Sequence, residues 1–173
     1  SKLSRNLFTR TGYTFAGWNT QADGTGESFA DEGLVSTLVA DGTSAILYAQ
    51  WTAKTYTITL VADGATSQGT TTITVTFDAK PDKIPTVATK EGYDLSGYYT
   101  EVGGKGTKIF NGDGTSINPW NTDGENIKLY AYFTADQVNV TVEYYLMNLD
   151  GTTYVLKDTL PEKGEADKQV TFA

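Results

Sequence analysis

Apolar and polar positions alternate in two stretches near the middle of the chain. In residues 56–60 (YTITL) and 71–77 (TTITVTF), single threonines separate the large apolar side chains. A period of two places all the apolar side chains on one face of an extended strand, so both stretches are predicted to be strands with one buried face. The intervening residues 62–69 (ADGATSQG) are typical of a turn. Together these segments predict a β-hairpin with a long loop.

The same alternation predicts four further strands, at residues 47–51, 129–133, 138–146 and 154–160. The last two flank a turn at residues 148–151 and are predicted to pair as a hairpin. The only candidate for a helix is residues 79–90 (AKPDKIPTVATK), where Pro81 and Pro85 leave room for one or two turns at most. We therefore expect a mostly β chain with little helix, in the α+β class.

An internal repeat becomes visible when the aromatic blocks are aligned. Residues 11–20 (TGYTFAGWNT) correspond to residues 91–100 (EGYDLSGYYT), with an offset of 80 residues. Residues 47–53 (LYAQWTA) correspond in the same way to residues 129–135 (LYAYFTA), with an offset of 82 residues. The chain is therefore predicted to contain two divergent copies of one structural unit.

The period divides the chain into one complete unit and two incomplete ones. Residues 54–135 form a complete repeat, residues 1–53 hold the C-terminal half of a first repeat, and residues 136–173 hold the opening hairpin of a following module. The junctions between these parts are very short. We therefore expect neighbouring units to be closely coupled, and the tandem modules to form a rod.

Composition narrows the range of functions. The 173 residues carry 21 acidic and 13 basic side chains, a net charge of −8, which disfavours nucleic acid as a partner. No apolar run approaches the length needed to span a bilayer, so we expect no membrane insertion. The chain contains neither cysteine nor histidine. Their absence removes the usual thiolate and imidazole metal ligands, the cysteine nucleophile and the commonest general base.

The repeated blocks carry a resemblance to a known family. Both copies contain Gly-Tyr-x-Phe/Leu-x-Gly-Trp/Tyr, then a glycine loop, then Leu-Tyr-Ala-x-Trp/Phe-Thr-Ala. With these blocks, residues 8–53 and 54–135 resemble the Listeria–Bacteroides repeat of internalin-type bacterial surface proteins. The second copy departs from the pattern by conservative aromatic exchanges, Trp18 to Tyr98 and Trp51 to Phe133. The tail from Val142 is similar to the start of a mucin-binding-protein-like repeat.

This resemblance implies a β-grasp-like fold, in which a sheet wraps around a short helical or irregular crossover. It also implies a secreted or cell-wall-attached bacterial surface protein. In such a protein, modules of this kind form a stalk between an adhesive head and the cell wall.

The aromatic residues of the stretch GYTFAGW (12–18) could form a sugar-binding platform or part of a core. Parity places Tyr13 and Phe15 on one strand face, and Phe15 corresponds to Leu95 in the second copy. The position therefore requires a large apolar side chain, which favours a core. Strict alternation places Trp18 on the opposite face, unless Gly17 marks a bulge that turns Trp18 back inward.

The same reasoning divides the remaining aromatic positions into two groups. Positions that repeat as apolar bulk are expected to be mostly buried: Tyr13, Phe15, Trp51, Tyr93, Leu95 and Phe133. Tyr130 and Tyr132 have the opposite parity to Leu129 and Phe133, so they are the better candidates for an exposed aromatic pair that contacts a ligand.

Two acidic loops, residues 111–116 (NGDGTS) and 121–126 (NTDGEN), contain fragments of a calcium-binding pattern. That pattern requires a glutamate at its twelfth position, and residue 122 is a threonine. We interpret both loops as Asx turns and expect no metal site. The loop GGKG at residues 103–106 lacks the hydroxyl residue and spacing of a phosphate-binding loop, and its counterpart DGTG has no lysine.

Two pairs of carboxylates could in principle act as acid and base in a glycosidase, namely Asp31 with Glu32 and Asp123 with Glu125. Both pairs lie in glycine- and asparagine-rich loops and do not recur in the other copy. We interpret them as solvated loop residues, and expect no catalytic residue, no cofactor and no enzyme activity.

Two hypotheses about function remain open at the level of the sequence. In the first, the chain is a non-catalytic stalk or spacer of a surface adhesin, and its partners are the neighbouring repeats. In the second, it binds a glycan or a host surface protein through Tyr130, Tyr132 or the loop at residues 111–126.

Overall fold

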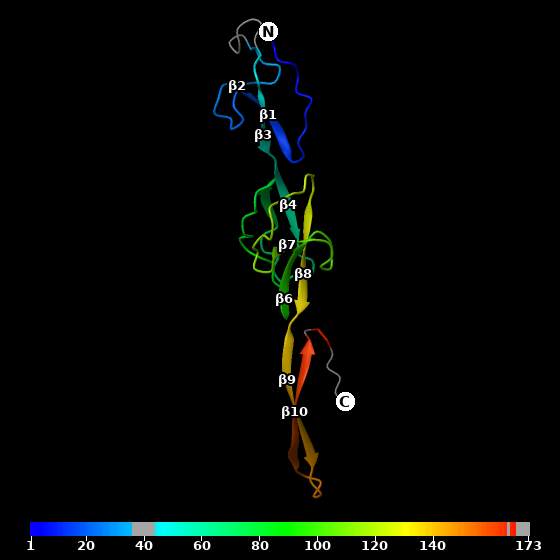
Figure 1. Cartoon of the computed structure of the whole chain (residues 1–173). Coiled ribbons are helices and arrows are strands. Elements are labelled where there is room, and N and C mark those ends of the chain that lie inside the picture. Colours follow the sequence, from blue (N-terminus) through cyan, green and yellow to red (C-terminus); the bar gives the residue numbers. More distant parts are fainter. Residues whose placement is uncertain (36–43, 166, 169–173) are drawn as a thin grey trace. The chain divides into compact units, whose positions relative to one another are not determined.

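The computed structural model describes residues 1–35, 44–165 and 167–168 (Figure 1). These residues form ten β-strands and no helix, so the prediction of a mostly β chain is confirmed. The strands are β1 (Tyr13–Asn19), β2 (Ser28–Phe29), β3 (Tyr48–Ala53), β4 (Thr55–Val61), β5 (Thr72–Thr76), β6 (Tyr93–Tyr99), β7 (Lys108–Asn111), β8 (Lys128–Ala135), β9 (Gln137–Met147) and β10 (Tyr154–Glu165).

The helical turn considered for residues 79–90 does not form, and the segment is irregular. Its two prolines lack a backbone N–H and disfavour helical geometry in the residue before them. Its remaining backbone groups find partners elsewhere: the Ile84 N–H donates to the Gly114 carbonyl at 3.0 Å, and the Ala88 N–H donates to the Tyr98 hydroxyl at 2.9 Å. Of the two crossovers that the resemblance allows, the irregular one is present.

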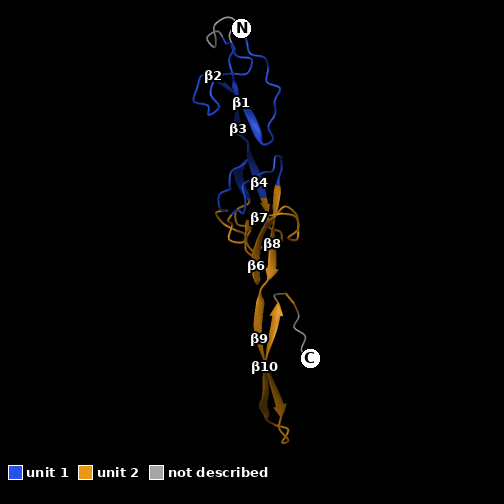
Figure 2. Ribbon diagram, viewed as in Figure 1, with its two compact units in different colours: residues 1–59, 72–83, 116–127 blue, residues 60–71, 84–115, 128–173 orange. Residues whose placement is uncertain are grey.

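The chain divides into two compact units, each assembled from separate stretches of sequence (Figure 2). Unit 1 comprises residues 1–59, 72–83 and 116–127, and unit 2 comprises residues 60–71, 84–115 and 128–173. The repeat boundaries at residues 53/54 and 135/136 are a property of the sequence alignment and stay a prediction.

Unit 1 contains two groups of paired strands. In the first, β1 lies between β2 and β3 and is antiparallel to both. In the second, β4 pairs antiparallel with β5, from Thr55 opposite Thr76 to Thr59 opposite Thr72. The apolar side chains of the hairpin point inward, and Ile58 and Val75 are almost inaccessible to solvent. The predicted hairpin and its buried face are confirmed.

Unit 2 contains a three-strand arrangement like that of β1, β2 and β3, and it also contains the hairpin of β9 and β10. Strand β6 lies between β7 and β8, antiparallel to both, as β1 lies between β2 and β3. Its core includes Tyr98, Phe110 and Leu129, all fully buried. Strands β9 and β10 pair along almost their whole length, and most of their side chains are exposed.

A β-bulge occupies the same position in both copies. The pairing of β1 with β3 shifts between Phe15 and Gly17, and the pairing of β6 with β8 shifts between Leu95 and Gly97. The bulge turns Trp18 onto the face of Phe15, and the two rings lie 5.2 Å apart. The alternative in which Gly17 returns Trp18 to the inner face is therefore correct.

The six positions expected to be mostly buried are partly buried in the structure. None of Tyr13, Phe15, Trp51, Tyr93, Leu95 and Phe133 is fully enclosed, and none is among the exposed apolar residues. Full burial falls instead on Tyr98 and Phe110 in unit 2 and on Ile58 in unit 1. The repeated positions thus line the margin of the core.

Candidate functional site

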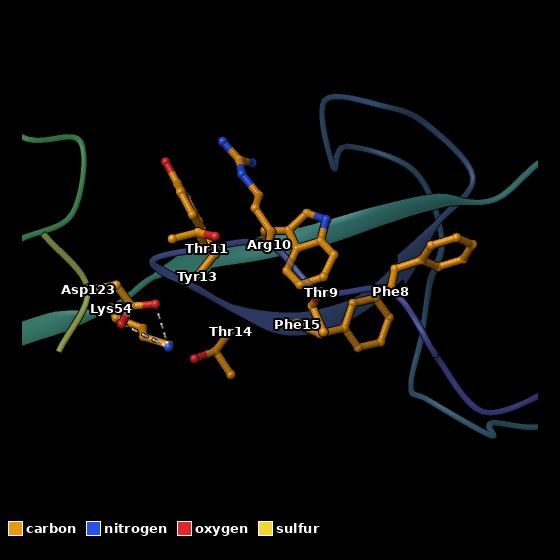
Figure 3. Close-up of a pocket in the computed structure, with 10 residues that line it drawn as sticks. Phe8, Thr9, Arg10, Thr11, Tyr13, Thr14, Phe15, Lys54 and Asp123 are labelled. Atoms are coloured by element: carbon orange, nitrogen blue, oxygen red, sulfur yellow. Dashed lines mark hydrogen bonds and ion pairs between the residues drawn. The ribbon is translucent and has the colours of Figure 1, made fainter. Parts of the chain in front are cut away.

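The candidate site is a groove in unit 1 with a volume of about 490 Å³. It lies where the segment that leads into β1 meets the end of β3 and the loop at residues 121–126 (Figure 3). Aromatic, hydroxyl and charged side chains line it together: Phe8, Thr9, Arg10, Thr11, Tyr13, Thr14, Phe15, Trp51, Lys54 and Asp123.

A tight turn at the start of β1 sets the position of Arg10. The Tyr13 N–H donates to the Arg10 carbonyl at 3.1 Å, and Gly12 has a φ of 76°, as a type II turn requires at its third residue. The turn places the Arg10 guanidinium 3.7 Å from the centre of the Tyr13 ring, and Figure 3 shows the two side chains standing side by side. This geometry gives a cation–π contact.

The absence of a side chain at Gly12 also makes room for an aromatic ring. A Cβ atom at Gly12 would collide with the Phe77 ring. That ring packs edge-on against Tyr13, with ring centres 5.7 Å apart. Beyond it, the Tyr13 hydroxyl donates to the Asp78 carboxylate at 2.7 Å, and this hydrogen bond raises the pKa of Tyr13. Tyr13 is thus held at both its ring and its hydroxyl.

Asp123 accepts hydrogen bonds from three directions at the edge of the groove. The Tyr56 hydroxyl donates to it at 2.7 Å, the Gly12 N–H at 3.0 Å and the Lys54 ammonium at 3.3 Å. The Tyr56 hydroxyl and the Gly12 N–H hold the pKa of Asp123 below its usual range. Desolvation and the hydrogen bond to Asp123 raise the pKa of Tyr56 to about 12. Asp123 is an exposed loop residue, as its sequence predicts, but its hydrogen-bond partners are distant in sequence and were not predicted.

Four aromatic rings form a chain of edge-to-face contacts across unit 1, which we call the aromatic ladder (Phe8, Trp18, Phe15 and Trp51). Successive ring centres lie 6.4, 5.2 and 5.4 Å apart. Phe8 is 67 % exposed, whereas its counterpart by the 80-residue offset, Ala88, is 1 % exposed. Partly exposed aromatic rings next to hydroxyl and charged groups suit a ligand that has both an apolar face and polar groups.

Trp18 and its counterpart Tyr98 differ in their polar contacts. The Tyr98 hydroxyl accepts a hydrogen bond from the Ala88 N–H. The Trp18 Nε1 atom is buried and has no hydrogen-bond partner among the described residues. An indole N–H can only donate, so it cannot accept from a backbone N–H as the tyrosine hydroxyl does.

The predicted ligand contacts Tyr130 and Tyr132 are partly buried, so the expectation that they form an exposed pair was wrong. The Tyr132 ring packs edge-on against Tyr99, with centres 6.0 Å apart, and lies so close to Gly104 that a Cβ there would meet it at 2.7 Å. Tyr130 lies opposite Tyr99 on the neighbouring strand. Whether either tyrosine contacts a ligand stays a prediction.

The loop at residues 111–116 forms the Asx turn that its sequence predicts. The Asp113 carboxylate accepts hydrogen bonds from the N–H and hydroxyl of Thr115, at 2.9 and 2.6 Å. The glycine loop at residues 23–26 forms the same motif, with Asp23 accepting from the Thr25 N–H at 3.0 Å. Asp31, a member of one of the two carboxylate pairs in the sequence, accepts a hydrogen bond from the Asn6 N–H at 2.7 Å.

Two organising residues went unnoticed at the level of the sequence. Asn19 is 1 % exposed, and its side-chain amide donates to the carbonyls of Gly24 and Gly26 and to the Ser28 hydroxyl. It therefore shapes the loop between β1 and β2. The second is Asp78, the partner of Tyr13. Its sequence signal is weak: Asp78 directly follows the predicted strand at residues 71–77.

The described part of the chain contains no helix long and apolar enough to cross a bilayer. Residues 2–50 and 56–132 match the sequence pattern of the Listeria-Bacteroides repeat domain, a repeat domain of bacterial surface proteins such as internalins. The match ends at residue 132, so the likeness of the tail to a mucin-binding repeat stays a prediction.

Two bacterial proteins are similar to large parts of the chain. A protein of Evansella cellulosilytica named as a Gly-rich membrane protein is 31 % identical over 140 residues, covering 78 % of this chain and 15 % of its own length. Internalin H of Listeria monocytogenes is 35 % identical over 127 residues, covering 73 % of this chain and 20 % of its own length. The chain thus spans a fifth or less of these relatives. No solved structure matches it.

The two separate matched segments agree with the two copies that the aromatic blocks reveal in the sequence. They cover more than half of the 173 residues. The chain belongs to the Listeria-Bacteroides repeat family.

Proposed function

We propose that the chain is a non-catalytic spacer, or stalk, region of a secreted or cell-wall-attached bacterial surface adhesin. The observation that carries this proposal is the direct joining of consecutive strand groups. A single residue, Lys54, separates β3 from β4, and a single residue, Asp136, separates β8 from β9. Links of one residue restrict the motion of the elements they join, as a spacer requires.

The engagement of the charged groups supports a structural role. Asp123 is ionised at neutral pH and accepts hydrogen bonds from Tyr56, Gly12 and Lys54. A general acid needs a raised pKa instead, close to the working pH. The environment of Asp123 therefore favours a permanent structural anion over a proton donor.

The spacer role can be tested by placing the chain between an adhesive domain and a wall anchor on a bacterial surface. We expect adhesion to depend on the presence of a spacer of this length, and an unrelated array of β-domains of equal length to replace it. Adhesion by the displayed chain without the adhesive domain would contradict a pure spacer role.

The aromatic ladder and the neighbouring groove favour a second candidate function, recognition of a glycan. Phe15 and Trp51 line the groove together with the hydroxyl groups of Thr9, Thr11 and Thr14. Sugar rings stack their apolar faces on aromatic side chains and direct their hydroxyl groups to polar neighbours. The second copy has Leu95 and Phe133 at the positions of Phe15 and Trp51, so the two copies provide an internal comparison.

This second function can be tested by titrating the chain with trisaccharides of β-linked glucose and of N-acetylglucosamine. Binding should shift the indole N–H signals of Trp51 and Trp18 in an NMR spectrum and leave that of Trp120 unchanged. The double substitution Phe15→Leu with Trp51→Phe installs the side chains of the second copy, and it should abolish the shift of the remaining Trp18 signal. Unchanged indole signals at millimolar sugar would argue against these glycan classes.

A further inference from the structure

A turn with the same geometry precedes β1 and β6, the corresponding strands of the two copies. We call the two turns the docking turns (residues 10–13 and 90–93). In both, the tyrosine N–H donates to the carbonyl three residues earlier at 3.1 Å, and the intervening glycine has a φ of 76° or 73°. In both, a cation three residues before the tyrosine lies over its ring, at 3.7 Å for Arg10 and at 3.6 Å for Lys90.

The glycine carbonyl of each docking turn holds the single residue that links one module to the next. The Lys54 N–H donates to the Gly12 carbonyl at 2.9 Å. The Asp136 N–H donates to the Gly92 carbonyl at 2.8 Å. The two linker positions thus carry side chains of opposite charge. What the two copies share is the backbone hydrogen bond from the linker residue to the glycine carbonyl.

A second turn, directly after the second strand of each opening hairpin, also recurs. We call these the end turns: the first comprises residues 76–79, and the second contains the described residues 165, 167 and 168. Each is closed by a hydrogen bond from the last N–H to the first carbonyl, at 3.1 and 3.2 Å. The third residue is an aspartate with a left-handed backbone, Asp78 with a φ of 60° and Asp167 with a φ of 58°. Aspartate is one of the few residues other than glycine that adopt this conformation readily.

The tyrosine of each docking turn meets the aspartate of the end turn that follows. The Tyr13 hydroxyl donates to Asp78 at 2.7 Å, and the Tyr93 hydroxyl donates to Asp167 at 2.8 Å. The hairpins between them differ: β4 and β5 have 7 and 5 residues, whereas β9 and β10 have 11 and 12. The tyrosine and aspartate are 65 residues apart in one case and 74 in the other. The contact is therefore kept across hairpins of unequal length.

From this recurrence we propose that the docking turn is an interaction surface for the opening hairpin of whichever module follows, and that the left-handed aspartate is the residue it recognises. The partner is thus a β-hairpin that ends in an aspartate-containing turn, largely independent of the length and sequence of its strands. This inference deepens the proposed spacer role, because one shared contact would let modules of different kinds follow one another in a chain.

The proposal can be tested in the complete chain by hydrogen exchange of the amides at the base of the β9–β10 hairpin. Tyr93→Phe removes the donor, and Asp167→Gly removes the carboxylate while permitting the left-handed backbone. Each should accelerate exchange at residues 137–140 and 162–165 by about two- to tenfold, the effect of one hydrogen bond. Because both substitutions remove the same contact, the double variant should exchange no faster than the faster single variant.

Two further measurements make the test specific. Tyr132→Phe serves as the control, because no hydrogen bond from the Tyr132 hydroxyl is seen within the described residues, and it should leave exchange in the hairpin unchanged. The hydroxyl pKa of Tyr93, which the bond to Asp167 raises, should move back toward its ordinary value in Asp167→Gly.

Equal exchange in Tyr93→Phe, Asp167→Gly and the control, or additive effects in the double variant, would overturn the proposal. The exchange experiment measures how firmly the β9–β10 hairpin is held within the chain. It can therefore succeed even if an unrelated array of domains fails to replace the chain as a spacer, so the two proposals fail independently.

Discussion

At the scale of single residues, the glycine of each bulge is fixed by two constraints at once. Gly97 has a φ of 153°, and a Cβ atom there would collide with the Phe110 carbonyl oxygen. Gly103 also has a positive φ, 75°, but no atom lies within 4 Å of where its Cβ would be. The two positions therefore separate the cost of backbone conformation from the cost of a steric clash.

We predict that Gly97→Ala destabilises β6 and β7 by about 3 kcal/mol and that Gly103→Ala costs about 1 kcal/mol. The larger value adds the collision with the neighbouring strand to the backbone strain. Hydrogen exchange of the β6 and β7 amides measures both effects. Equal losses would mean that the neighbouring strand moves aside and that the bulge does not require glycine for space.

The pair of Asp123 and Tyr56 gives unit 1 a defined pH dependence. The folded state lowers the pKa of Asp123, so its stabilising contribution is present above the ordinary aspartate pKa and is lost as the pH falls through the lowered value. The folded state raises the pKa of Tyr56 to about 12, so the corresponding contribution is present below the ordinary tyrosine pKa of 10.0 and is lost as the pH rises toward 12.

Asp123→Asn should therefore flatten the acid limb of the stability profile of unit 1, and Tyr56→Phe should flatten the alkaline limb between about pH 10 and 12. Urea unfolding followed by tryptophan fluorescence as a function of pH measures both, because all three tryptophans lie in unit 1. A parallel shift of the whole profile, without a change in either slope, would show that the pair does not titrate differently in the folded and unfolded states.

At the scale of elements, aromatic rings on different strands differ in how far they are enclosed. Phe110 in β7 is fully buried, whereas Phe15 in β1 is partly buried and lies at the margin of the groove. A fully buried aromatic ring that is cut back to alanine leaves a cavity, and a ring at the margin leaves a space that water can enter.

We predict that Phe110→Ala destabilises its unit by about 3–5 kcal/mol, and that Phe15→Ala costs less than Phe110→Ala but more than about 1 kcal/mol. Denaturant unfolding of each variant, compared with the parent chain, checks both values. A loss below about 1 kcal/mol for Phe15→Ala would remove this ring from the core and strengthen its assignment to ligand binding.

At the scale of the whole molecule, the sequence repeat makes a prediction about independent folding. Residues 54–135 carry a complete set of repeat blocks, and residues 1–53 lack the opening hairpin. A half sheet leaves unpaired backbone edges and an incomplete core. Residues 54–135 expressed alone should therefore unfold cooperatively on heating, and residues 1–53 alone should not. Cooperative unfolding of the shorter fragment would place the repeat boundary elsewhere.

The short links also predict that the tandem modules form a rod in solution. Small-angle X-ray scattering should then give a radius of gyration well above the roughly 16 Å expected for a compact globule of this length. A value near 16 Å would contradict the rod.

The sequence by itself determined the strands with alternating apolar residues, the repeat and the family. Alternating threonine and apolar residues fix the inner face of β4 and β5, because side chains of a strand point alternately to its two sides. The recurring glycine and aromatic blocks reveal the two copies for the same reason: each copy needs the same bulge and the same apolar positions. These are local constraints, and they leave a local pattern.

Only the tertiary structure decided which charged and aromatic residues work together. The partners of Asp123 could not be predicted, because Gly12 and Tyr56 lie 111 and 67 residues away in the chain. Tyr130 and Tyr132 looked exposed because parity describes one strand, whereas exposure depends on what covers each face of the sheet. The contact of Tyr13 with Asp78 depends on the antiparallel pairing of β4 and β5, which brings the end of β5 back beside the start of β4. A periodic pattern within one strand carries no information about residues so far apart in the chain. The contact of Tyr13 with Asp78 could therefore be recognised only in the folded structure.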